Sequence, residues 1–125
     1  LSAPGGELDI GFIARDRSIP PRYDNIRPRL EAAARLKVGD SLEIRSEKDG
    51  RYTFYADGCP VARSTSKLKP IPPGTTAVAA AFGVGYREGC DERYAAKIPE
   101  KIGKWPLVIP MLVEPPGTGN LSDGL

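Results

Sequence analysis

The sequence predicts an α+β domain: a strongly bent antiparallel sheet, or partly open small β-barrel, of about six strands with one α-helix. Several short segments alternate apolar and polar residues, and turn residues separate them. The 14 Gly and 13 Pro are more than a helical bundle would tolerate, and a single segment has helical spacing. A chain of 125 residues fits one domain, which we assign to residues 1–114, followed by a Gly/Pro-rich tail at residues 115–125.

The first predicted strand covers residues 8–15. Leu8, Ile10 and Phe12 occupy alternate positions there, which is the period of a strand with one buried face. A loop is expected at residues 18–21, because consecutive prolines remove backbone donors and restrict the residues before them.

Residues 25–36 form the predicted helix. Apolar side chains recur one turn apart in this segment, among several alanines that favour helix. Asp24 or Asn25 can cap it, and we expect Pro28 to lie in the first turn, where backbone N–H groups have no acceptor within the helix.

A three-stranded meander is the clearest structural signal. Residues 41–46, 51–56 and 59–64 read as strands, and Asp49-Gly50 and Asp57-Gly58 separate them. Asp-Gly pairs favour tight hairpin turns because both residues tolerate positive φ. We therefore expect two successive hairpins.

The remainder is predicted to be two strands joined by a long loop. Residues 75–86 read as a strand and residues 89–103 have no clear period. Residues 105–114 read as a last strand, bulged or at the edge of the sheet, because Pro106 and Pro110 cannot donate to a ladder.

Composition argues against several classes of protein. The chain has no histidine and two isolated cysteines, Cys59 and Cys90, so neither a zinc site nor a cofactor is expected. We interpret both as reduced thiols in a cytoplasmic protein. No apolar run approaches the length of a membrane span, so we expect a soluble chain. Because it starts at Leu1, we interpret it as a domain of a larger protein.

Catalysis is not expected, and we assign no catalytic or metal-binding residues. Ser64 and Lys67 match the S-x-x-K spacing of penicillin-binding enzymes, but Pro70 follows too closely for the helix that this spacing requires. Residues 83–85, Gly-Val-Gly, lack the remaining positions of a phosphate-binding loop. Without histidine, a general base would need another group with a displaced pKa, and the sequence reveals no suitable pair.

The leading functional hypothesis is a non-catalytic accessory module that binds nucleic acid, single-stranded or duplex. The net charge is only +2, but residues 15–37 carry seven basic and three acidic side chains. Cations would contact phosphates, and aromatic side chains on the strands would stack on bases. The residues assigned to this site are Arg22, Arg27, Arg29, Arg35, Arg63, Lys67, Lys69 and Tyr55.

Two other functions remain open. The module could dock another protein, or the rest of a larger protein, through an exposed strand edge or its Pro-rich loops; the interrupted last strand and residues 18–21 suggest this. A barrel that binds a small molecule would require an apolar pocket, which sequence cannot show.

The order of these features also resembles the small β-rich accessory segments that follow the motor core of some bacterial helicases. The similar stretches are LKVGDSLEI at residues 36–44, YTFYADG at 52–58, VARSTSK at 61–67 and WPLVIP at 105–110, together with Tyr94. The likeness covers residues 36–114. It departs after the third strand, where such modules often carry Gly-Leu-Ser and this chain has Arg63-Ser64-Thr65. The resemblance implies nucleic-acid handling or docking beside an enzyme, and no catalytic residue.

Overall fold

The computed structural model describes residues 12–16, 19–20, 22–64 and 71–114. The tail at residues 115–125 and the first half of the strand expected at residues 8–15 lie outside these ranges. The elements are α1 (Phe12–Arg15), α2 (Tyr23–Arg35), β1 (Ser41–Ser46), β2 (Tyr52–Ala56), β3 (Cys59–Arg63), β4 (Thr76–Tyr86), α3 (Glu92–Ala95) and β5 (Lys104–Val113).

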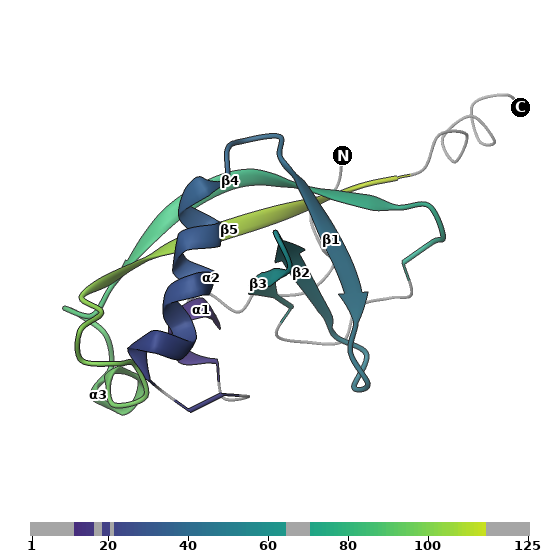
Figure 1. Ribbon diagram of the computed structural model, residues 1–125. Helices are drawn as coiled ribbons and strands as arrows, with labels where there is room; N and C mark the ends of the chain where they lie inside the picture. The colour runs from purple at the N-terminus through teal and green to yellow at the C-terminus, as the bar shows by residue number, and fades with distance from the viewer. Residues whose placement is uncertain (1–11, 17–18, 21, 65–70, 115–125) are drawn as a thin grey trace, which may run out of the picture.

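The strands form one antiparallel sheet in the order β3-β2-β1-β4-β5, which within the described residues has five strands. The sheet is bent so strongly that its two outer strands, β3 and β5, contact each other. Helix α2 packs against these same two strands and lies in front of the long β4–β5 pair (Figure 1). The α+β prediction of a bent, partly open barrel with one main helix is confirmed, with one strand fewer than expected.

The strand not found among the described residues is the first one. Phe12–Arg15 forms the short helix α1, so the prediction of a strand at this end of residues 8–15 was wrong. Phe12, Ile13 and Ala14 are all at least 96% buried, whereas a strand with one covered face would bury every second residue. Because α1 contacts α2, β3 and β5, consecutive side chains are enclosed from several sides.

Helix α2 begins earlier than capping residues suggested. Its first residue is Tyr23, which packs against the core, and the N-cap Arg22 makes no side-chain capping bond. Asn25 instead donates a hydrogen bond to the Pro20 carbonyl (3.2 Å). Pro28 therefore lies inside the helix and not in its first turn, at an exposed position where water can reach the carbonyl left without a partner.

The meander is confirmed. Gly50 (φ 85°), Asp57 (φ 51°) and Gly58 (φ 77°) have the positive φ that the two Asp-Gly turns require. Strands β1 and β2 pair with Ile44 opposite Phe54, and β2 and β3 pair with Phe54 opposite Ala62. A register shift between Phe54 and Tyr55 marks a bulge in β3, which increases the local bend.

The hydrophobic core lies between the inner face of the sheet and the two N-terminal helices. Phe54 and Val61 come from the meander, and Ile26 from α2. Ala77 and Ala79 of β4 are fully buried, and their small side chains permit close packing at the centre. Among the described residues, none of the helices has the length and apolar character that a membrane crossing requires.

Strands β4 and β5 form a long hairpin that extends beyond the rest of the sheet. The prediction that the last strand is an edge strand is confirmed, since β5 ends the strand order. The loop expected at residues 89–103 contains helix α3. Asp91 precedes this helix, and its carboxylate accepts a hydrogen bond from the Arg93 backbone N–H (2.9 Å), which lowers the pKa of Asp91.

Candidate functional site

The exposed face of α2 carries balanced charge. Asp24, Arg27, Glu31 and Arg35 follow one another at three- and four-residue spacing, and all four are exposed. Arg27 forms an ion pair with Glu31 (3.8 Å). Arg22, at the N-cap, and Arg35 are separated by about 20 Å along the helix axis, given 1.5 Å per residue. The predicted basic helix therefore does not present its arginines as one patch.

Arg29 and Arg63 come together around Phe12. The Arg63 guanidinium lies 4.7 Å, and that of Arg29 5.9 Å, from the centre of the Phe12 ring. Arg29 also donates a hydrogen bond to the buried Asp16 carboxylate. We call Phe12, Asp16, Arg29 and Arg63 the Phe12 cluster. Two predicted site residues thus meet, in a partly buried position that links α1 to α2 and β3.

The segment after β3 is described only as far as Ser64. Lys67 and Lys69 lie outside the described residues. Ser64 is fully buried, and its hydroxyl accepts a hydrogen bond from the Tyr52 backbone N–H (3.1 Å). This serine of the S-x-x-K spacing therefore helps to hold β2 and β3 together.

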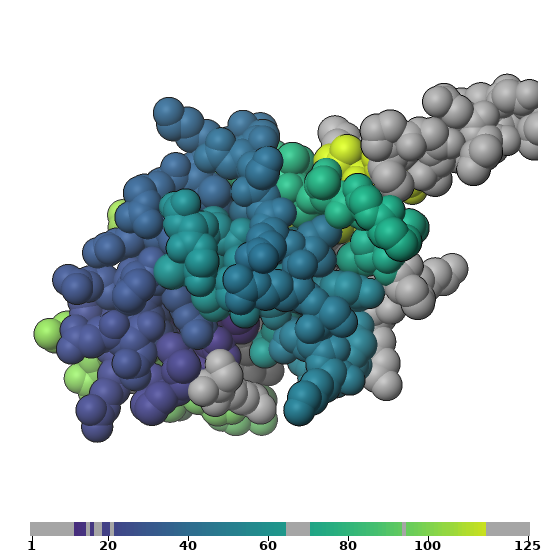
Figure 2. Space-filling model, turned by 45° about the vertical axis from the view of Figure 1, so that its right-hand side comes forward, coloured from purple at the N-terminus to yellow at the C-terminus, as the bar shows by residue number. Residues whose placement is uncertain are grey.

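The meander, coloured blue to teal on the face shown in Figure 2, carries a cation stacked on an aromatic ring. Register places Arg45 opposite Thr53 and Glu43 opposite Tyr55, so these side chains share one face of the meander. On this face Glu43 and Arg45 are exposed, Tyr55 is half-buried and Thr53 is buried. The Arg45 guanidinium lies 3.9 Å from the centre of the Tyr55 ring. Thr53 also pairs with Arg63, but the Arg63 guanidinium lies against the Phe12 ring and its Nε atom is buried, so Arg63 belongs to the Phe12 cluster. We call the surface formed by Glu43, Arg45 and Tyr55 the meander face.

Arg45 is held in place by neighbours on this face. It donates hydrogen bonds to the Glu43 carboxylate at 2.9 and 3.2 Å, and the pKa of Arg45 is raised first by this bond and further by Tyr55. The side chains of Arg45 and Glu43 are 51% and 58% exposed, so a ligand in solution can reach them. Sequence reasoning selected Tyr55 and missed Arg45, although the Asp49-Gly50 turn fixes the register that brings them together.

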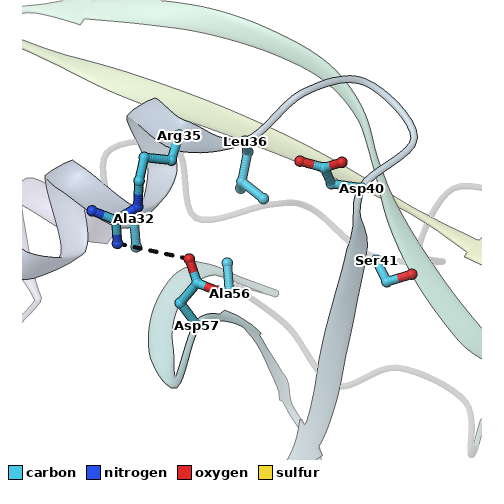
Figure 3. A pocket seen from close by; sticks show the side chains of 7 residues that line it. All are labelled: Ala32, Arg35, Leu36, Asp40, Ser41, Ala56 and Asp57. Carbon is cyan, nitrogen blue, oxygen red and sulfur yellow. Dashed lines mark ion pairs between the residues drawn. The ribbon is translucent and has the colours of Figure 1, made fainter.

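A polar hollow of about 210 Å³ lies at the C-terminal end of α2. In Figure 3, Arg35 and Asp57 point toward each other across it, 3.7 Å apart, while Asp40 and Ser41 stand on the opposite side. Because Arg35 is paired with Asp57, it adds little net charge for a phosphate. The lining residues are Ala32, Arg35, Leu36, Asp40, Ser41, Ala56 and Asp57.

Beyond Ala79, β4 is paired on one side only within the described part of the chain. Strand β1 meets β4 at Ala77 and Val78, and Gly39 and Asp40 add backbone hydrogen bonds to Ala79. Ala80 is a bulge without a partner in the β4–β5 register, and from residue 81 to residue 86 β4 pairs with β5 alone. We call residues 80–86 the β4 edge. It carries three exposed large apolar side chains, Phe82, Val84 and Tyr86.

The described residues contain no group of three or more Cys, Asp or Glu side chains arranged to hold a metal ion. Cys59 and Cys90 are free thiols.

Comparison of the chain with protein-family models, with curated proteins and with solved structures finds no match. The resemblance to helicase accessory segments therefore stays a prediction.

Proposed function

We propose that this domain is a non-catalytic accessory module of a larger cytoplasmic protein and binds single-stranded nucleic acid on the meander face. The observation that carries the proposal is the stack of the exposed Arg45 on the half-buried Tyr55 ring. Unpaired bases stack on aromatic rings and on guanidinium planes, and this stacking does not require a particular base. A duplex offers no such free base faces, so single strands are the better fit.

The accessible charge on this face supports the same proposal. The Arg45 side chain is 51% exposed, so a phosphate of a bound strand can reach its guanidinium. Arg63 adds no such contact, because it lies against Phe12 with its Nε atom buried. Since Glu43 offsets part of the charge of Arg45, we expect modest affinity that decreases with salt.

This proposal uses fewer of the arginines than the sequence suggested. On the exposed face of α2, Arg27 and Arg35 alternate with two acids and are ion-paired, so they contribute little to a phosphate track. The helicase resemblance agrees with a role in nucleic-acid handling, because it covers the whole meander. Tyr55 remains from the sequence-based set, and Arg45 joins it.

The proposal is tested by titrating labelled single-stranded and duplex oligonucleotides, followed by fluorescence anisotropy at low and moderate salt. Tyr55→Ala should weaken single-strand binding roughly tenfold or more, because base stacking contributes about 1–3 kcal/mol per base. Tyr55→Phe keeps the ring and should bind like the wild type. Arg45→Ala should also weaken binding and reduce its salt dependence.

Arg35→Ala is the matched control, since it removes the same charge from an exposed site outside the meander face. It should leave the affinity within about twofold of the wild type, as expected for an ion-paired surface residue. Absence of binding at low salt would reject the proposal. Equal losses in Arg35→Ala and Arg45→Ala would favour diffuse attraction over the meander face.

A second candidate function is docking of a polypeptide at a strand edge, and the β4 edge favours it specifically. The sequence suggested an edge at the last strand, whose prolines limit pairing. Within the described residues, the edge that retains its backbone donors belongs to β4.

A further inference from the structure

The β4 edge carries few of the features that keep strand edges unpaired. Among the described residues, the one such feature is a bulge at Ala80, where the β4–β5 register shifts. Residues 80–86 read AAFGVGY, with no charged residue and no proline. Proteins commonly protect an edge strand with lysine, proline, an inward-pointing charge or a covering loop, because unpaired backbone groups attract another strand. None of the described residues pairs with this edge on its outer side.

Its backbone groups and its apolar side chains belong to the same residues. The Arg87 N–H donates to the Gly103 carbonyl on the β5 side (2.8 Å). Backbone groups alternate between the two sides of a strand, so those of Tyr86, Val84 and Phe82 point to the open side. The side chains of these residues are 59%, 51% and 38% exposed. An added strand would thus gain hydrogen bonds and apolar contacts together.

We propose that the occupant of the β4 edge is the β4 edge of a second copy of this chain, paired antiparallel about a twofold axis at Gly83. This proposal rests on the strand-edge candidate and is independent of nucleic-acid binding. In this register Phe82 lies opposite Val84 of the second copy, and Ala80 opposite its Tyr86. The interface is isologous, so each copy supplies the same residues.

The length of the edge argues for this occupant. The free stretch starts where Gly39 and Asp40 bond to Ala79 and ends where Arg87 leads into the next connection. The regular part of the edge is residues 81–86, because Ala80 is a bulge. Gly83 lies between Phe82 and Val84, so a twofold axis there pairs the open backbone groups of each with those of the other in the second copy. No charged residue of either edge meets another, and the net charge of +2 per chain opposes association only weakly.

The exposure of Val38 agrees with the same arrangement. Val38 is 72% exposed and precedes Gly39, whose N–H bonds to the Ala79 carbonyl at the start of the free stretch. In the proposed register, Tyr86 of the second copy lies at the start of the free stretch, opposite Ala80. Four of the five exposed large apolar side chains of the described residues, Val38, Phe82, Val84 and Tyr86, would then lie along one interface.

Sedimentation equilibrium of the whole chain over a wide concentration range tests the proposal. The wild type should show a reversible monomer–dimer equilibrium. Val84→Lys should raise the dimer dissociation constant by at least about tenfold, because an edge lysine is a common natural protection against edge pairing. Ile109→Lys changes an exposed apolar residue on β5 and should dimerise like the wild type.

Hydrogen exchange of the Phe82, Val84 and Tyr86 amides shows whether the β4 edge is paired, free or covered, and so distinguishes the ways in which the dimer proposal could fail. In the dimer they should be protected, and dilution or Val84→Lys should remove the protection. A wild type that stays monomeric, or dimers that persist unchanged in Val84→Lys, would overturn the second copy as occupant. If the protein is monomeric and these amides exchange fast, the edge is free, and docking of a different chain remains as the second candidate function. If the protein is monomeric and these amides are protected, the edge is covered within the chain, and both the dimer and the docking of another chain at this edge are rejected.

Discussion

Glycine is required at position 85 because the Trp105 ring lies directly against its backbone. A Cβ atom added at Gly85 would lie 2.2 Å from the Trp105 Nε1 atom and 2.4 Å from the neighbouring ring carbon. Trp105 is opposite Gly85 in the β4–β5 pair and is buried, so its indole lies directly on the glycine backbone. No side chain larger than hydrogen fits there unless the ring moves.

We therefore expect Gly85→Ala to lower the free energy of unfolding by about 1–3 kcal/mol, the usual cost of overpacking. Gly83→Ala is its control two residues away. Its added Cβ would meet Leu107 at 3.5 Å, an ordinary contact, so stability should change by less than about 1 kcal/mol. Urea unfolding followed by fluorescence of the single tryptophan measures both. Equal stability of the two variants would contradict the placement of the Trp105 ring.

At the scale of elements, one arginine organises the connection between β4 and β5. Arg87 donates hydrogen bonds to the carbonyl oxygens of Ala95 (2.9 Å), Ile98 (2.7 Å) and Ile102 (2.9 Å), and to that of Pro99. Half-buried carbonyls on a turn-rich segment have few other donors. The Arg87 guanidinium donates hydrogen bonds to several of these carbonyls at once. These bonds explain how a connection with a single short helix keeps a defined structure.

Arg87→Lys should destabilise this connection even though the charge is kept, because an ammonium group cannot span the same carbonyls. We expect a loss of about 1–3 kcal/mol, the cost of leaving buried acceptors unsatisfied. Hydrogen exchange should accelerate at residues 95–102 and remain unchanged in the meander. Arg93→Lys, on an 86% exposed side chain of the same connection, should stay within about 0.5 kcal/mol of the wild type. Uniform acceleration across the sheet would show that Arg87 acts globally.

The elements that the sequence predicted well are those defined by local chemistry. The two Asp-Gly turns determine where β1, β2 and β3 begin and end. The strand expected at residues 8–15 was wrong at residues 12–15, because burial from several sides cannot be read from alternation. Helix α2 starts at Tyr23 because a tertiary contact there outweighs the capping preference of Asp24 and Asn25.

The candidate sites depended on information that a linear reading does not contain. Counting arginines in residues 15–37 ignored helical phase, which places Glu31 between Arg27 and Arg35 on the same exposed face. Arg45 can be recognised as a candidate site residue only when the β1–β2 register is known, because that register brings it to Tyr55. The β4 edge depends on the strand order, because β1 covers β4 only as far as Ala79.

At the scale of the whole molecule, the two N-terminal helices are joined to each other and to the sheet through the Phe12 cluster. The ion pair between Asp16 and Arg29 connects them, with side-chain exposures of 3% and 14%. Such a pair adds little net stability compared with apolar residues of similar size, but removing one member leaves a charge without compensation.

Asp16→Asn should therefore lower the free energy of unfolding by about 3 kcal/mol, since the Arg29 charge stays half-buried without its carboxylate. The double variant Asp16→Asn/Arg29→Met removes that charge and keeps an apolar stem over Phe12, so it should recover most of the loss. Urea unfolding of the wild type, both single variants and the double variant gives the coupling energy. Additive losses would mean that Asp16 and Arg29 act independently. A strong positive coupling would show that Asp16 and Arg29 act as a unit that holds α1 and α2 against β3 and β5.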